Sequence, residues 1–333
     1  MNSFGNIFRV QVFGESHGPL VGVTIDGVPA GIPLTAADFG PAMERRKGLD
    51  MAGTTPRKES DIPVFRSGIY QDVTTGAPLQ LIFENTNVRS QDYELQKNIP
   101  RPGHADWVAG QKFRGFNDIR GGGAFSARLT AGIVAAGVVA GKVLKAGGYA
   151  IDIQTAFREV GGKATMTEGM EYAKERKDSV GAVITCTITG VPAGWGEPFW
   201  NSVESVLAHA MFAIPAVKGI EFGAGFAAAR MTGKEHNDAI TDADGTTRTN
   251  HAGGIVGGLT NGNPLIFSLA FKPTSSTPQP QESFNFTTGQ VESFSVKGRH
   301  DLCVALRAPV IIESMAAIVL LDLMMQQRAV YGR

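Results

Sequence analysis

Four of the six histidines in this chain lie in short turn sequences beside glycine, arginine or aspartate. They are His17, His104, His251 and His300. Imidazole changes charge near neutral pH, and loops positioned by a rigid scaffold often carry proton-transfer groups. A single histidine of this kind is more often an ordinary turn residue. Four in similar settings favour a site that moves protons.

A glycine run could hold an anion. Arg120-Gly121-Gly122-Gly123 leads into an apolar stretch, residues 125–145, that is typical of a buried helix. Backbone N–H groups at a helix start attract phosphate. The segment is neither a Walker loop nor a dinucleotide fingerprint, so a plain helix-entry turn remains the alternative.

A second anion-binding segment is Lys272-Pro273-Thr274-Ser275-Ser276, which follows a predicted strand. It combines a cation, hydroxyl groups and a turn fixed by proline, which suits a phosphate. Serine-rich loops are also commonly just solvated, so this segment alone is weak support.

Arginines gather in the same motifs, and guanidinium forks match phosphate and carboxylate oxygens. The set comprises Arg45, Arg46, Arg101, Arg120, Arg128, Arg299 and Arg307. A small polyanionic ligand is indicated. The alternative is a set of structural ion pairs with acids such as Glu15, Asp106 and Asp301, which we expect for some of the arginines.

Composition limits the class of partner. The 333 residues are 43% hydrophobic, with 31 Lys and Arg against 31 Asp and Glu. No net field draws in nucleic acid or an anionic membrane, so anion recognition must be local. The N-terminus has no signal pattern, and the longest apolar stretch, residues 129–141, is too short to span a bilayer.

The two cysteines, Cys186 and Cys303, show neither metal-ligand spacing nor a disulfide framework, which predicts a reducing compartment and a cytoplasmic protein. No His, Cys or carboxylate pair has the close spacing of a metal motif, so we expect no catalytic metal.

The elements that must position these residues form a mixed pattern without regular βαβ spacing, which predicts an α+β fold. Strands are predicted over residues 8–13, 21–28, 182–189 and 265–271. Helices are predicted over residues 35–47, capped by Thr35, and over residues 125–145, 200–212 and 309–328. Residues 233–249 and 273–297 are predicted loops, and no linker or repeat divides the single predicted domain, residues 1–333.

Taken in order, six segments closely resemble the chorismate synthase family. They are Phe13-Gly14-Glu15-Ser16-His17-Gly18, Arg101-Pro102-Gly103-His104-Ala105-Asp106, Arg120-Gly121-Gly122-Gly123, Asn250-His251-Ala252-Gly253-Gly254, Lys272-Pro273-Thr274-Ser275-Ser276 and Gly298-Arg299-His300-Asp301. Residues 25–31 and 214–219 add to the match, which spans essentially the whole chain.

The resemblance implies a β-α-β sandwich, with helices between antiparallel sheets, usually assembled as a homotetramer. It implies the anti 1,4-elimination of phosphate from 5-enolpyruvylshikimate 3-phosphate to give chorismate, the last step of the shikimate pathway. This reaction needs reduced FMN (FMNH2) although it is redox-neutral overall. No added reductase-like segment is evident, so we expect an external flavin reductase, with NADPH as a candidate external reductant.

The resemblance also implies roles for individual residues. His17 would protonate or hydrogen-bond the departing phosphate, His104 would protonate the reduced flavin, and Asp301 would help deprotonate the flavin N5 as the substrate C6 hydrogen leaves. Substrate charge would be bound by Ser16, Arg46, Arg101, Arg128 and Arg299. The flavin would be held by Gly123, Ala124, Phe125, Ser126, Lys234, Gly257, Lys272, Pro273, Thr274, Ser275, Ser276 and Arg299.

The chain departs from the family pattern in three places. Ala124 and Phe125 stand where most members have arginine and serine, so one cation and one hydroxyl are lost. Lys47-Gly48-Leu49 replaces Arg-Pro-Gly, and Ala52 replaces an arginine. Lys234 stands in place of a serine, and we hypothesise that it compensates for the arginine missing at position 124.

Two other functions fit part of the pattern. One is a phosphate-ester hydrolase or transferase with His17 as nucleophile, which would need no reduced flavin. The other is a non-catalytic phosphometabolite- or nucleotide-binding protein, disabled by the lost arginines, which would bind ligand without forming chorismate.

Overall fold

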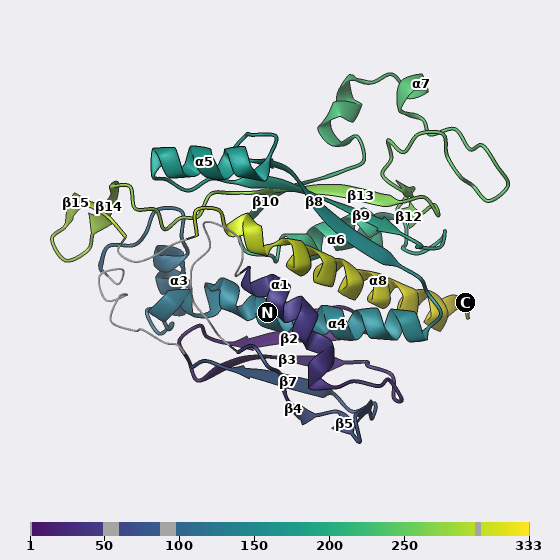
Figure 1. Cartoon of the computed structure of the whole chain (residues 1–333), viewed down its shortest axis with the longest axis horizontal. Coiled ribbons are helices and arrows are strands. Elements are labelled where there is room, and N and C mark those ends of the chain that lie inside the picture. The colour runs from purple at the N-terminus through teal and green to yellow at the C-terminus, as the bar shows by residue number, and fades with distance from the viewer. Residues whose placement is uncertain (1, 49–59, 87–97, 297–300, 333) are drawn as a thin grey trace.

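A computed structural model describes residues 2–48, 60–86, 98–296 and 301–332. Two antiparallel sheets enclose a layer of helices (Figure 1). The predicted α+β class is therefore confirmed, as is the β-α-β sandwich that the family resemblance implies.

The first sheet carries the N-terminal part of the chain and has the strand order β1-β2-β3-β7-β4. Its strands are β1 (Ser3–Phe4), β2 (Arg9–Gly14), β3 (Leu20–Asp26), β7 (Leu79–Glu84) and β4 (Val64–Ser67), with a separate short hairpin of β5 (Ile69–Tyr70) and β6 (Val73–Thr74). The β2–β3 turn contains His17, so pairing of these strands fixes where this histidine stands.

The second sheet has the order β10-β13-β9-β8. Its strands are β10 (Val217–Phe222), β13 (Leu265–Phe271), β9 (Ala182–Thr189) and β8 (Asp152–Val160). Along β9 the buried residues alternate with partly exposed ones, because successive side chains point to opposite faces of a strand. The bounds predicted for β9 and β13 are confirmed, and helix α5 (Met166–Arg176) covers the outer face of this sheet (Figure 1).

The middle layer consists of α1 (Gly40–Lys47), α4 (Thr130–Ala146), α6 (Val203–Met211) and α8 (Pro309–Tyr331). The α4 and α8 backbones approach closely where a Cβ added to Gly137 would lie 2.3 Å from the Ser314 Cβ. Only glycine fits at this crossing.

The two longest helices bear on the membrane prediction. Residues 127–146 and helix α8 are each long and apolar enough, by length and composition, to cross a bilayer. The prediction that the longest apolar stretch, residues 129–141, is too short was therefore wrong, because the apolar helical span continues to residue 146. Most of each span is buried between the two sheets, as in the core helices of soluble proteins.

Helix starts differ from the prediction. Helix α4 begins at Thr130 and not at residue 125, because the 3-10 turns η3 (Arg120–Phe125) and η4 (Ala127–Leu129) precede it, with the extended residue Ser126 between them. Helix α6 begins after the 3-10 turn η5 (Phe199–Asn201). Thr35 caps as predicted, but its first turn is the 3-10 segment η1 (Ala36–Phe39), which continues into α1.

Both predicted loops contain regular structure. Residues 233–249 begin with the short helix α7 (Gly233–His236), and residues 273–297 contain the hairpin β14 (Gln281–Asn285) and β15 (Gln290–Phe294). The other elements within the described ranges are α3 (Asp106–Phe113), η6 (Gly225–Arg230), β11 (Ile255–Val256), β12 (Leu259–Thr260) and η7 (Val304–Arg307).

Candidate active site

The β2–β3 turn is hydrogen-bonded to residues 120–123, which we call the glycine loop. The Ser16 N–H donates to the Gly123 carbonyl at 3.1 Å, and the Ser16 hydroxyl lies 3.3 Å from the His17 Nδ1. His17 is buried, with 7% of its surface exposed. An imidazole so enclosed can act only on a group that enters the protein.

The glycine loop lies between the two histidines predicted to transfer protons. Gly121, Gly122 and Gly123 all have positive φ, at 59°, 83° and 53°, a conformation that side chains disfavour. A Cβ added to Gly121 would lie 2.0 Å from the His17 Nδ1, and one added to Gly122 would lie 3.4 Å from the His104 Cε1. The prediction that this loop enters the apolar helix directly was wrong, since η4 separates them.

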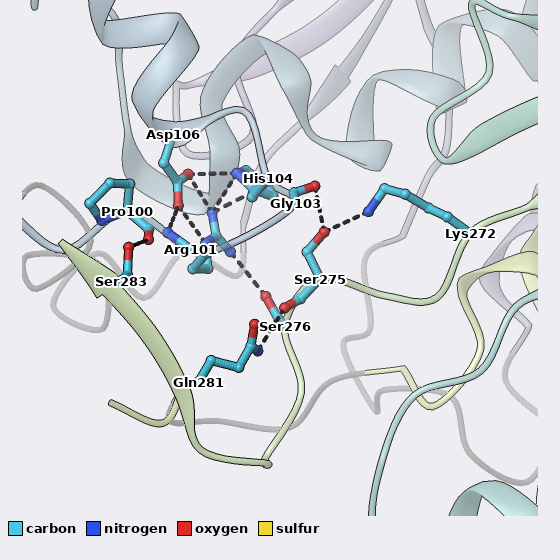
Figure 2. A network of polar contacts seen from close by, with 10 residues as sticks. All are labelled: Pro100, Arg101, Gly103, His104, Asp106, Lys272, Ser275, Ser276, Gln281 and Ser283. Atoms are coloured by element: carbon cyan, nitrogen blue, oxygen red, sulfur yellow. Dashed lines mark hydrogen bonds and ion pairs between the residues drawn. The ribbon is translucent and has the colours of Figure 1, made fainter. Parts of the chain in front are cut away.

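His104 stands in a polar network with Arg101 and Asp106 (Figure 2). The His104 Nδ1 lies 2.5 Å from the Asp106 Oδ1, while the Arg101 Nε donates to the Asp106 Oδ2 at 2.7 Å. Burial acts to raise the pKa of Asp106, but hydrogen bonds from Arg101 and His104 outweigh it and hold that pKa far below its usual range. Asp106 is therefore a carboxylate that orients the imidazole.

The predicted phosphate-binding segment packs on this network. The Lys272 Nζ donates to the Ser275 Oγ at 2.6 Å, and that hydroxyl donates to the Gly103 carbonyl at 2.8 Å (Figure 2). The Arg101 Nη1 donates to the Ser276 Oγ at 3.1 Å. Burial, together with the nearby Lys218, lowers the pKa of Lys272. Ser275 and Gly103, which are 172 positions apart in the chain, are thus in direct contact, and their two segments pack together.

Most of the predicted substrate-binding residues meet at one cavity of about 350 Å³, which we call the arginine cavity. Its lining includes Ser16, Arg46, Lys47, Asp61, Gly121, Ser126, Arg128, Thr130, Thr274, Ser276, Asp301 and Arg307. The lining thus brings together cations from α1, η4 and η7 with the predicted catalytic carboxylate. Such a concentration of positive charge suits a small polyanion.

Asp61 is a site residue that the sequence did not reveal. Its carboxylate accepts hydrogen bonds from both Arg46 and Arg128, and its side chain is fully buried. Burial acts to raise the pKa of Asp61, but the two guanidiniums prevail and lower it. The partners lie 15 and 67 positions away, so no local motif signals the contact.

Polar atoms of residues that line the arginine cavity include the Arg46 Nε and the Thr274 Oγ1. Both are buried, and neither has a hydrogen-bond partner within the described part of the chain. Buried polar groups are nearly always satisfied, so unpaired ones at a cavity wall indicate that a ligand completes them. The atom types, an N–H donor and a hydroxyl, suit oxygen acceptors.

Asp301 and Arg307 complete the wall of this cavity. The Arg307 Nη2 lies 3.3 Å from the Asp301 Oδ1. The expected structural pairing of some arginines is confirmed here and at Arg101–Asp106. The Asp301–Arg307 pair lines the arginine cavity, whereas Arg101 and Asp106 do not, so in this fold an ion pair can also belong to a ligand-binding wall.

A second cavity of about 600 Å³ adjoins the first, and we call it the apolar cavity. The two share Ser126, Thr130, Ile214 and Pro215. The apolar cavity is also lined by Phe4, Val10, Val12, Lys112, Phe113, Ala124, Phe125, Ile133, His209, Phe212, Lys218, Lys272 and Met315. Phe113 and Phe125 pack with ring centroids 6.3 Å apart, and three lysines supply positive charge.

Some predicted site residues lie elsewhere. Lys234 is exposed on α7, which stands well away from α3 in Figure 1, and neither Lys234 nor Gly257 lines either cavity. His251 packs against His236, with ring centroids 6.0 Å apart.

Two of the predicted arginines form ion pairs with carboxylates. Arg45 pairs with Glu313, and Arg120 pairs with Asp118. The residues Leu49, Ala52, Gly298, Arg299 and His300 lie outside the described ranges.

Buried arginines and a carboxylate surround linked cavities in this antiparallel sandwich, and His17 and His104 lie against the neighbouring glycines. This arrangement defines an enzyme that acts on a small polyanion. The family model of chorismate synthase matches residues 8–325. A chorismate synthase of Chitinophaga pinensis is 60% identical over 328 residues, covering 98% of both chains. One of Korarchaeum cryptofilum is 41% identical over 352 residues, covering 97% of each.

A solved crystal structure of chorismate synthase superposes with a TM-score of 0.74 at 25% identity, covering 97% of this chain and 93% of that one. The chain belongs to the chorismate synthase family. It is a carbon–oxygen lyase, and the family reaction is the conversion of 5-enolpyruvylshikimate 3-phosphate to chorismate and phosphate.

Proposed function

We propose that the arginine cavity binds 5-enolpyruvylshikimate 3-phosphate and is where the family's 1,4-elimination takes place in this chain. The observation that carries the proposal is the convergence of Arg46, Arg128 and Arg307 on one cavity beside Asp301. The substrate carries two carboxylates and a phosphate, which guanidinium groups bind in forked geometry. Positive charge at the phosphate also stabilises it as it departs.

Within this site His17 is assigned to the leaving phosphate. It is buried beside Ser16, and Ser16 lines the arginine cavity. We propose that its imidazole donates a hydrogen bond or a proton to a phosphate oxygen. Asp301, on the wall of the same cavity, would take up a proton during removal of the hydrogen at the substrate C6.

The residues present fit a flavin phosphate in the adjoining apolar cavity. A volume of about 600 Å³ lies within the roughly 300–1,000 Å³ typical of ligand pockets. Phe113 and Phe125 offer aromatic surface, and Lys272 offers a cation. Bound reduced FMN supplies the electronic chemistry of the elimination.

We propose that His104 protonates the reduced flavin, while Gly123, Ala124, Phe125, Ser126 and residues 272–276 hold it. Support for the role of His104 comes from Asp106, which fixes the ring at the Nδ1 side. The cation lost at position 124 would be replaced by Lys112, Lys218 and Lys272, all of which line the apolar cavity. The site proposed here needs no contribution from Lys234 within one chain.

The wider setting is also proposed. We infer one domain over residues 1–333, supported by a continuous hydrophobic core that includes Phe83 of the first sheet and Phe267 of the second. We further propose a cytoplasmic homotetramer, supplied with reduced flavin by an external reductase, with NADPH as reductant. Two free, buried cysteines are consistent with a reducing compartment.

The test of the function is an anaerobic assay of chorismate and phosphate release from the substrate, with and without reduced FMN. The proposal expects both products in equal amounts only when reduced FMN is present. Phosphate release without the flavin would favour a hydrolase that uses His17, and binding without turnover would favour a non-catalytic binding protein.

A further inference from the structure

We propose that Asp61 is a positioning residue, one that holds the guanidiniums of Arg46 and Arg128 in the geometry that receives the anionic substrate. The inference rests on the proposed function, because it assigns a duty within the same cavity. It concerns a carboxylate that no sequence motif identified.

The contact joins three separate parts of the fold. Asp61 lies just before β4, Arg46 is near the end of α1, and Arg128 is in η4. One carboxylate oxygen of Asp61 accepts from the Arg46 Nη2, and the other accepts from the Arg128 Nη1. The side chains of Arg46 and Arg128 are only 9% and 4% exposed. A charge-assisted bridge of this kind fixes both partners.

The two arginines depend on Asp61 to different degrees. Arg128 is also held by the Asn85 Oδ1 at 2.9 Å and by the Glu84 carbonyl at 3.3 Å. Apart from Asp61, the described residues give Arg46 only a long contact, 3.5 Å, to the Thr130 Oγ1, and its Nε has no partner among them. Without Asp61 the Arg46 guanidinium would therefore lose its main anchor, while Arg128 would keep most of its contacts.

Charge alone gives the opposite expectation for substrate binding. A carboxylate in the cavity wall repels an anionic substrate, so simple electrostatics would have the removal of Asp61 tighten binding. Without the carboxylate, however, two buried guanidiniums stand close together and repel each other. If geometry prevails, neutralising Asp61 weakens substrate binding although the cavity becomes more positive. The sign of the change decides between the two effects.

The test compares Asp61→Asn with the parent by steady-state kinetics and by calorimetric titration of the substrate into flavin-free protein. We expect KM and the dissociation constant to rise by roughly tenfold or more, which corresponds to a loss of about 1.4 kcal/mol in binding free energy. The kcat should change by less than about threefold. A lower KM, or unchanged values of both, would overturn the proposal.

Two further variants keep the result interpretable. Asp26→Asn removes an exposed carboxylate paired with Arg9 and should leave KM unchanged. Asp61→Glu keeps the charge but displaces it by one methylene, and it should raise KM by about threefold or more. If Asp61→Asn does not fold, this variant carries the test, and a parental KM in Asp61→Glu would refute positioning.

Failure of this inference and failure of the proposed function are distinguishable. If the parent makes no chorismate with reduced FMN, the function itself is wrong. If the parent is active and the Asp61 variants bind substrate as it does, only the positioning role is lost.

Discussion

Asn85 joins Arg128 to the turn that bears His17. Its Oδ1 accepts from the Arg128 Nε at 2.9 Å, and its Nδ2 donates to the carbonyls of Glu15 and Gly18 at 3.1 and 2.9 Å. One amide just after β7 therefore fixes Arg128, proposed to bind substrate, relative to the turn of His17, proposed to transfer a proton. This link connects the residue that we propose for substrate binding with the one that we propose for protonating the leaving phosphate.

We predict that Asn85→Asp separates these two duties. Aspartate can still accept from Arg128, but it cannot donate to the carbonyls of Glu15 and Gly18, so the His17 turn loses its anchor. We expect kcat to fall by roughly tenfold or more, with a smaller change in KM. Asn85→Ala removes both links and should change kcat and KM together. Steady-state kinetics measures both, and a parental kcat in Asn85→Asp would contradict the coupling.

A second prediction concerns the stability contributed by Asp106. Its folded-state pKa is depressed, so the carboxylate stabilises the fold above its unfolded pKa of about 4, and this contribution is lost as the pH falls below that value. Asp106→Asn should lower the free energy of unfolding by about 3 kcal/mol at pH 7, because a buried ion pair with Arg101 is broken.

Denaturant unfolding at several pH values checks this prediction. The difference between parent and Asp106→Asn should shrink as the pH falls below about pH 4. A difference that grows as the pH falls would show that the assigned sign is wrong.

The third prediction tests the glycine loop. Gly121→Ala places a Cβ within 2.0 Å of the His17 Nδ1 at a positive φ, so the imidazole must move. We expect kcat to fall by about a hundredfold, since catalytic groups tolerate little displacement. Gly141→Ala, at an exposed site of α4 with no atom within 4 Å of the new Cβ, is the matched control and should stabilise the protein by about 0.5–1 kcal/mol without affecting kcat. Equal activity in both variants would remove His17 from the mechanism.

The fourth prediction places the flavin phosphate beside Lys272. Lys272→Ala should weaken FMN binding by about tenfold, because the variant loses a partly buried cation at the wall of the apolar cavity. Lys234→Ala should leave the FMN affinity of the protein unchanged, because Lys234 lines neither cavity. Flavin fluorescence titration gives both affinities. Weaker FMN binding by Lys234→Ala than by Lys272→Ala would instead support the hypothesis that Lys234 compensates for the arginine missing at position 124.

The sequence predicts those parts of the fold that local pattern determines. Strand β9 alternates buried and partly exposed residues, and its predicted bounds agree with the structure. The start of α4 was placed too early because the apolar composition continues back to Phe125, whereas the backbone is interrupted by the left-handed glycines and the extended Ser126. The β14–β15 hairpin was missed because its polar residues resemble a loop.

The site shows the same division. Short motifs, with the family resemblance that they carry, indicate His17, His104 and Asp301 as candidate catalytic residues, because glycine, arginine and histidine in turns are visible locally. Asp61 and Asn85 act through partners far away in the chain, so their contacts exist only after the sheets and helices have packed. Contacts between residues so far apart in the chain leave no short motif in a single sequence.

The most direct test of the account is anaerobic chorismate formation with reduced FMN by the parent and by His17→Ala, His104→Ala and Asp301→Ala, each first shown to be folded by circular dichroism. We predict that the parent turns over only with reduced FMN and that each variant loses at least about a hundredfold in kcat, the usual size of a general acid–base contribution. Parental turnover by any well-folded variant would contradict the role assigned to that side chain, and parental turnover by all of them would refute the site.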